Sequence, residues 1–254
     1  MRKALVRLLR NQSADSSDRT MKALASRGLL VGDSELTSSG RREALRFVPL
    51  EEKCEFLDLT LQEIKSPCQG RTPEIALWES LVAKGYIGTY CEGGAILILL
   101  RAAALDVLAK LNTFESRSDA CTRFTEAQFS ILATESQQIV EEIRGSDIDR
   151  IVRNFDEIYS HDFVRSIYPS LSTSVVAELF CAVGSEPLAR VASALIEDPY
   201  TLRSGWPDLT MLRERELRWI EVKTTDKLHL NQIRTIEHMA PLLPGEFSVV
   251  RLVT

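Results

Sequence analysis

The sequence has no apolar run long enough to cross a membrane. Its most apolar stretch, Ala95 to Leu100, ends at Arg101 and is far shorter than the ~20 residues that a membrane span needs. The amino terminus is basic, but the segment that follows keeps Arg7 and Arg10 and never develops the apolar core of a signal peptide. We therefore expect a cytoplasmic protein that does not act at a membrane.

Cysteine and histidine are scarce and show no pattern typical of zinc or of disulfides. The five cysteines are an odd number without a Cys-x-x-Cys pair, so we interpret them as reduced thiols. The three histidines lack zinc-like spacing to one another or to the cysteines, which argues against a structural zinc. These residues are Cys54, Cys68, Cys91, Cys121, Cys181, His161, His229 and His238.

Net charge is low but unevenly distributed. The chain of 254 residues is 44% apolar, enough for one large domain or for one medium domain with a small appendage. Residues 1–50 hold ten Lys/Arg against five Asp/Glu, a net charge of +5, whereas the total is -5 and the remainder therefore carries -10. The amino-terminal fifth is the better docking surface for a polyanion.

Residues 1–48 have the pattern of a small basic unit. We expect, in order, a helix over residues 4–10, a helix over 18–27 with Asp18 as N-cap, two short strands around Gly32–Asp33, and a helix from Thr37.

Arg27-Gly-Leu-Leu30 and Leu36-Thr-Ser-Ser-Gly-Arg41 in this unit resemble the end of a winged-helix DNA-binding module. The resemblance implies that basic side chains contact DNA phosphates, contacts that position a protein without reading sequence. The candidates are Arg19, Lys22 and Arg27. The alternative is a packing appendage whose basic residues are merely solvated.

The middle of the chain is predicted to be helical. Residues 49–73 form a charged connector, helical over 50–66, with a linker at Ser66–Pro73. After a helix from Glu74 to Lys84, residues 96–111 form a helix so apolar that it must be buried. Residues 112–198 form a helical insertion with helices at Phe124–Glu142, Asp147–Tyr159, Thr173–Val183 and Pro187–Glu197.

Near the carboxyl end, two apolar runs flank the charged turn Arg213–Glu216 and predict an antiparallel hairpin. Asp208 stands at the entry of its first strand. On the second strand Glu221 and Lys223 share a face, while Val222 points the opposite way into a core. Two carboxylates and an amine on one face suit phosphodiester hydrolysis with one or two Mg²⁺ or Mn²⁺ ions. The alternative is a half-exposed strand with alternating charges.

Gly205-Trp-Pro-Asp208 and Ile220-Glu-Val-Lys223 resemble the motif of PD-(D/E)XK nucleases, specifically the virus-type replication-repair nuclease (VRR-NUC) branch. The resemblance implies an α/β fold with a restriction-endonuclease-like αβββαβ core. It also implies that Asp208, Glu221, Lys223 and the Val222 carbonyl form the catalytic and metal-binding centre. Gln232 matches the family's glutamine on the next helix and is a candidate substrate-binding residue, although the Thr224–Leu228 turn departs from the family pattern.

The residue pattern around the motif predicts a first short strand at Tyr200–Arg203, a helix at Leu228–Met239 and a closing strand at Phe247–Val253. The order that the resemblance implies, a helix, three strands, a helix and a strand, agrees with this pattern.

A third carboxylate has two candidates. Tyr90-Cys-Glu-Gly-Gly-Ala-Ile-Leu97 resembles the segment that opens a buried helix in the Fanconi-associated nuclease subgroup, which implies that Glu92 is catalytic and binds metal. Glu178 is the rival, since stand-alone members of the family carry their acid at about that spacing. A glutamate in the first turn can also simply favour its helix.

The resulting hypothesis is a nuclease domain over residues 74–254, behind the connector and the winged-helix-like region. It predicts a metal-dependent nuclease acting on flapped or otherwise branched DNA in repair or replication, associated with the nucleoid if the protein is bacterial. The alternatives are a toxic DNase with a cognate inhibitor and a non-catalytic winged-helix DNA-binding protein.

Overall fold

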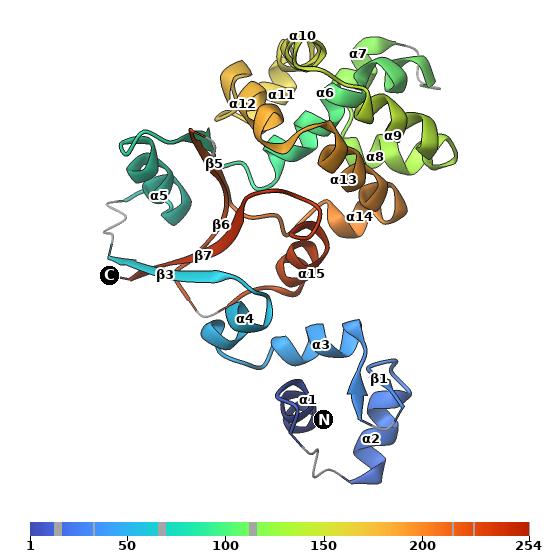
Figure 1. Ribbon diagram of the computed structural model, residues 1–254, viewed down its shortest axis with the longest axis vertical. Coiled ribbons are helices and arrows are strands. Elements are labelled where there is room, and N and C mark those ends of the chain that lie inside the picture. Colours follow the sequence, from blue (N-terminus) through green and yellow to red (C-terminus); the bar gives the residue numbers. More distant parts are fainter. Residues whose placement is uncertain are drawn as a thin grey trace.

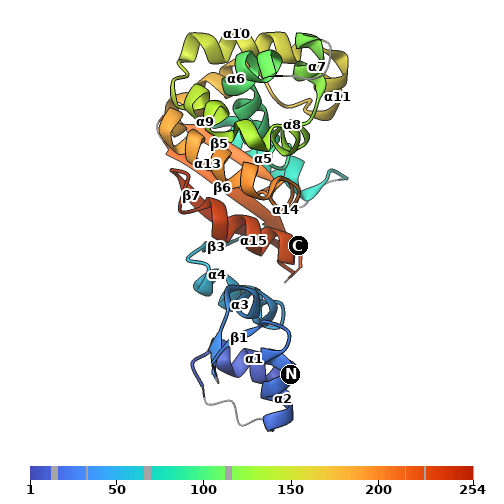
Figure 2. The ribbon, with the colours of Figure 1, turned by 90° about the vertical axis from the view of Figure 1, so that its right-hand side faces the viewer.

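The computed structural model of the chain describes residues 1–12, 17–32, 34–65, 70–111, 116–214, 216–225 and 227–253 (Figure 1). Several expectations concern other residues and lie outside the described ones: Asp33, residues 66–69 of the linker with Cys68, residues 112–115 of the insertion, Arg215 and Asp226. Three tiers follow one another along the long axis, namely the amino-terminal unit, a sheet with its helices, and a helical tier (Figure 2).

The amino-terminal unit has the predicted order of elements. These are α1 (Arg2–Leu9), α2 (Asp18–Ala25), β1 (Leu30–Val31), β2 (Glu35–Leu36) and α3 (Ser38–Leu45). Thr37 begins α3, because its hydroxyl oxygen accepts a hydrogen bond of 2.9 Å from the Gly40 backbone nitrogen. A Cβ on Gly40 would lie 2.0 Å from the Leu29 carbonyl oxygen, so only glycine permits this close packing. One detail was wrong: Ser17 holds the N-cap position of α2, and Asp18 is its first helical residue.

The expected helical connector contains a strand. After α4 (Leu50–Phe56), β3 (Thr60–Lys65) pairs in parallel with the closing strand, from Thr60↔Ser248 to Lys65↔Val253. The expectation of a helix over 50–66 is therefore wrong beyond α4. An edge strand tolerates charged side chains, so Glu63 and Lys65 concealed the pattern of a strand.

The central sheet has five strands in the order β3-β7-β6-β5-β4. β3 and β6 flank β7 in parallel, whereas β6 pairs antiparallel with β5, and β5 with β4. The remaining strands are β4 (Ile87–Thr89), β5 (Leu209–Arg213), β6 (Glu216–Lys223) and β7 (Glu246–Val253). The predicted hairpin is β5–β6, with Leu209 opposite Ile220 and Arg213 opposite Glu216.

Helices cover both faces of this sheet. On one face, α5 (Pro73–Val82) packs Leu77 against a cluster that includes Ile220 and Val222. On the other face, α15 (Leu230–Met239) shares the main core with Trp219, whose ring stacks on Phe247 at 5.6 Å. The predicted inward direction of Val222 is confirmed, and the odd-numbered residues at the end of β6 lie on the α15 face.

The helical tier is inserted between β4 and β5 (Figure 1). It contains α6 (Gly94–Leu111), α7 (Arg117–Thr122), α8 (Thr125–Ile131), the 3₁₀ helix η1 (Ala133–Glu135), α9 (Ser136–Arg144), α10 (Ile148–Tyr159), α11 (Asp162–Ile167), α12 (Thr173–Val183), α13 (Ser185–Glu197) and α14 (Pro199–Leu202). The single helix expected over 124–142 is divided into α8, η1 and α9. The other three helices expected in the insertion are confirmed, to within two residues at each end.

Residues 200–203 were expected as the first core strand, but residues 200–202 are helical and Arg203 is the C-cap of α14, because Pro199 at the first helical position favours this helix. The strand that precedes the hairpin in the sheet is β4, on the other side of the insertion. The expected core contains a helix, three strands, a helix and a strand. In the structure, the elements in that order are α5, β4, β5, β6, α15 and β7.

Among the described residues, no single helix has both the length and the apolar composition of a membrane span. Taken together, α12 and α13 have that length and composition, but the two helices are bent by 95° relative to each other.

Candidate active site

Asp208 lies at the point where β5 begins and is fixed by the backbone of β6. Its Oδ2 accepts a hydrogen bond of 2.7 Å from the Val222 backbone nitrogen, just beyond the last ladder pair, Leu209↔Ile220. Because the N–H and C=O of one residue in an extended strand point to the same side, the Val222 carbonyl also faces the Asp208 side of β6.

The glycine of the motif lets this segment pass close to α15. Gly205 has a φ of +82°, and a Cβ there would lie 2.4 Å from the backbone of Asn231. Trp206 is fully buried and donates a hydrogen bond of 2.8 Å to the Leu202 carbonyl oxygen. The Gly-Trp-Pro-Asp sequence thus anchors the entry of β5 beside the amino end of α15.

Glu221 is completely buried, with 0% of its surface exposed. Its Oε1 accepts hydrogen bonds from Lys223 Nζ and from Gln232 Nε2. Its Oε2 is buried and has no hydrogen-bond partner in the part of the chain that the structure describes. An ionised oxygen without a partner in such a place is costly, and it is the kind of atom that a bound cation would satisfy.

Both acids have raised pKa values. Burial is the main cause for Asp208, opposed by the Val222 N–H and the Lys223 charge and reinforced by the charge of Glu74. Burial also raises the pKa of Glu221 well above its ordinary value, and the neighbouring Asp208 raises it further, while Lys223 opposes the shift. The charge of Lys223 thus offsets the burial of the two acids only in part, and a divalent cation would supply further positive charge.

Glu74 is an acid near the site that the sequence pattern marked only as the start of a helix. It lies half-buried in the first turn of α5, close enough to Asp208 to act on its pKa. The signal that could have found it is an acid on the helix just before the first strand of the core. Of the described His, Cys, Asp and Glu side chains, however, no three are grouped as a ready-made metal site.

Comparison with known proteins identifies the region around this pair. No curated protein matches the chain. Residues 149–251 match the family model of the VRR-NUC domain. This stretch, less than half of the chain, is therefore similar to a VRR-NUC domain.

Two solved structures are similar to this chain in fold. A crystal structure of paFAN1 bound to 2-nucleotide 5′-flap DNA with a gap matches with a TM-score of 0.59, 18% identity, and coverage of 98% of this chain and 51% of that one. The complex with a 1-nucleotide 5′ flap matches with a TM-score of 0.56, also at 18% identity, over 98% and 49%. The chain thus spans about half the length of these proteins.

The VRR-NUC match runs from α10 to β7 and includes Asp208, Glu221, Lys223 and Gln232. It begins after both Glu74 and Glu92. Glu92 lies in the turn before α6 with a strained φ of +25°, and its Oε1 accepts a hydrogen bond of 3.4 Å from the Gly205 backbone nitrogen. The fold therefore brings Glu92 to the Gly-Trp-Pro-Asp segment, although its side chain is exposed.

Glu178 lies inside the VRR-NUC match, on the exposed side of α12, a helix that contacts β4 and β6. Within the described chain it makes no hydrogen bond or ion pair with Asp208, Glu221 or Lys223.

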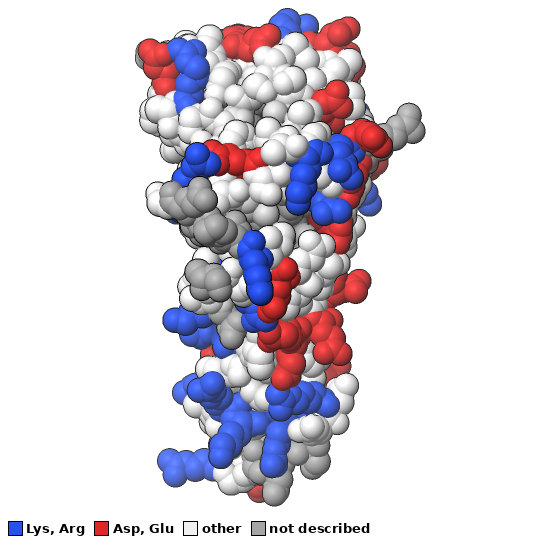
Figure 3. Space-filling view, turned by 90° about the vertical axis from the view of Figure 1, so that its left-hand side faces the viewer, with Lys and Arg blue, Asp and Glu red and all other residues white. Residues whose placement is uncertain are grey.

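The three basic candidates of the amino-terminal unit lie away from this pair. Arg19 and Lys22 are exposed on α2, and Arg27 is exposed just after it. None of the three forms an ion pair with a described carboxylate. Figure 3 shows Lys and Arg side chains gathered at the end of the molecule that this unit forms, with Asp and Glu side chains next to them toward the sheet.

Proposed function

We propose that the chain is a metal-dependent, structure-selective DNA nuclease that acts on flapped or otherwise branched DNA in repair or replication. The observation that carries the proposal is the buried Asp208–Glu221 pair beside Lys223, in a stretch that matches the VRR-NUC domain. The paFAN1 complexes with 5′-flap DNA support the class of substrate.

The donor atoms suit a hard divalent cation. Two carboxylates and the Val222 carbonyl offer oxygen ligands, which Mg²⁺ and Mn²⁺ prefer, and Oε2 of Glu221 has no other described partner. Glu92 or Glu74 would add a further carboxylate, enough for one or two ions. When bound, such an ion would neutralise charge on the scissile phosphate and lower the pKa of a water molecule bound to the ion.

The residues around the pair have separate roles in this proposal. Lys223 places a positive charge beside Glu221, where it orients the attacking water and stabilises the negative charge that develops. Gln232 holds Glu221 in position through the same oxygen. Arg19, Lys22 and Arg27 contact phosphates of the DNA away from the cleavage point.

The test is incubation with end-labelled flap, fork, junction and single-stranded DNA in Mn²⁺, Mg²⁺ or EDTA. We expect preferential cutting of a branched substrate with metal and no cutting in EDTA. Asp208→Asn should be inactive, while the control Asp149→Asn, which removes an exposed carboxylate from α10, should cut like the wild type. Binding of DNA without cutting in either metal would instead favour a non-catalytic DNA-binding protein.

A further inference from the structure

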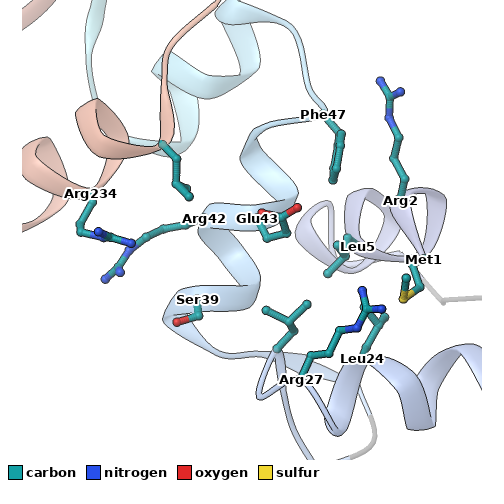
Figure 4. A pocket seen from close by; sticks show the side chains of 12 residues that line it. Met1, Arg2, Leu5, Leu24, Arg27, Ser39, Arg42, Glu43, Phe47 and Arg234 are labelled. Carbon is teal, nitrogen blue, oxygen red and sulfur yellow. The ribbon is translucent and has the colours of Figure 1, made fainter. Parts of the chain in front are cut away.

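A cavity of about 520 Å³ lies where the amino-terminal unit meets α15 (Figure 4). Its volume falls within the range of about 300–1,000 Å³ that is typical of small-molecule and cofactor sites. The floor is apolar and combines residues of both parts of the chain: Leu5, Leu24, Leu29, Phe47 and Leu230. A cavity shared by two tiers suits a ligand that spans them.

The rim of this cavity is basic. Figure 4 shows Arg42 on α3 and Arg234 on α15 reaching toward each other, with Arg27 on the opposite side. One carboxylate, Glu43, also lines the cavity, but it pairs with Arg46 at 2.8 Å. Arg42 pairs with Glu237 at 2.7 Å, whereas neither Arg27 nor Arg234 has a carboxylate partner among the described residues. These two guanidinium groups favour an anionic ligand, and their planar forks match phosphate oxygens.

An apolar floor with a basic rim matches the chemistry of an unpaired nucleotide. The faces of a nucleobase are apolar and stack on aromatic or apolar side chains, while the neighbouring phosphates need cations. Phe47 offers a ring on the floor, and the guanidinium groups of Arg2 and Arg46 lie 4.8 Å and 5.9 Å from its centre, so positive charge stands beside the apolar surface. An anion without an apolar part would make no favourable contact with the apolar floor.

A second cavity adjoins this one at the amino end of α15. It measures about 470 Å³, shares Leu230 with the first, and is lined by Arg46, Lys53, Lys227, Leu228, His229 and Asn231. Asn231 lies against Gly205, and the next residue, Gln232, holds Glu221. The two cavities therefore lie side by side at the amino end of α15, the helix that also carries Gln232.

We propose that these two adjoining cavities hold an unpaired DNA strand that leads away from the cleavage point, with phosphates in the second cavity, lined by Arg46 and Lys227, and one base in the first, on Phe47. The inference rests on the proposed DNA-cutting function and adds the element of the substrate that the amino-terminal unit holds. It gives that unit a role beyond charge attraction, because the pocket takes a base rather than a phosphate alone.

The test is a binding scan with the full chain in EDTA, so that nothing is cut. The probes are fluorescein-labelled oligothymidylates of about eight nucleotides, within the ~4–16 that single-strand sites cover, each with one abasic sugar at a different position. We expect one position, or two adjacent ones, at which removal of the base weakens binding about tenfold, the effect of giving up one stacked base. Equal affinity for all the probes would overturn the pocket.

Variants then locate the base. Ser39 is exposed on α3 and lines the pocket, so Ser39→Trp fills it without changing its charge, and the position-specific effect should disappear. Arg27→Ala and Arg234→Ala should each weaken binding of every probe several-fold and reduce its salt dependence. The matched control is Arg153→Ala on α10 in the helical tier, which should leave binding unchanged. A Ser39→Trp variant that keeps the wild-type scan contradicts the proposal.

The two proposals fail in different ways. If the wild type cuts flap DNA with Mn²⁺ but binds all abasic probes alike, the nucleotide pocket is wrong and the nuclease assignment stands. If no substrate is cut, the nuclease assignment is wrong, whatever the scan shows.

Discussion

Gln232 on α15 donates a hydrogen bond from its side-chain amide to Oε1 of Glu221 on β6. The amide is itself oriented, because its oxygen accepts a hydrogen bond of 2.8 Å from the His229 backbone nitrogen. The position of a buried carboxylate thus depends on how α15 begins.

We predict that Gln232→Leu impairs cutting by about 10–100-fold and raises the Mn²⁺ concentration needed for half-maximal activity, the usual effect of removing a residue that orients a metal ligand. The measurement is cleavage of flap DNA across a Mn²⁺ titration. Gln138→Leu, an exposed substitution on α9, is the control. An unchanged Mn²⁺ dependence of Gln232→Leu would show that the hydrogen bond has no part in metal binding.

The raised pKa of Glu221 predicts how the metal-free protein responds to pH. A group with a raised folded-state pKa contributes stability below its unfolded pKa, here about 4.5, and that stability is lost as pH rises through the folded-state pKa. In EDTA, Glu221→Gln should therefore gain stability over the wild type as pH rises from 4.5 to 8, by about 1–3 kcal/mol. Thermal melts at several pH values measure this, with Glu178→Gln as control. If the difference in stability between Glu221→Gln and the wild type does not change with pH, the raised pKa of Glu221 is contradicted.

The third acid can be identified by comparing single substitutions. Glu92 contacts the backbone at Gly205, and Glu74 acts on the pKa of Asp208, so Glu92→Gln and Glu74→Gln should both cut poorly and need more Mn²⁺. Glu178→Gln should behave almost like the wild type. Half-maximal Mn²⁺ concentrations of the three variants provide the comparison, and a defect confined to Glu178→Gln would make Glu178 the ligand.

The basic residues of α2 predict a change in salt dependence. If Arg19 and Lys22 bind DNA phosphates, replacing both with Ala should lower the slope of log affinity against log salt by about 0.9 for each phosphate that the protein no longer neutralises. Fluorescence anisotropy with duplex DNA in EDTA measures the slope. The control removes two exposed charges elsewhere, Lys84 and Arg153. Identical slopes would show that α2 does not touch DNA.

The hairpin of the site could be predicted from sequence because its determinants are local. Asp208, Glu221 and Lys223 are carried by two adjacent strands, and the period of a strand puts Glu221 and Lys223 on one face. The helices of the insertion have clear apolar spacing, so their existence was predictable, although the breaks around η1 were not.

The remaining features depend on long-range packing. β3 could not be predicted because its edge position tolerates charge, and β4 because three residues are too few for a pattern. Glu74 comes near Asp208 only when α5 packs on the sheet, and the two cavities exist only because α3 and α4 meet α15. Contacts between segments so far apart in the chain leave no local signal.

The central claim is that Asp208, Glu221 and Lys223 form a catalytic centre. Its most direct test is the single-turnover rate of flap cleavage in Mn²⁺ for Asp208→Ala, Glu221→Ala and Lys223→Ala. If all three groups act on the reacting phosphate, each substitution should lower the rate by about 10³-fold, with circular dichroism and DNA binding nearly unchanged. A near wild-type rate in any one of these folded variants would contradict the account.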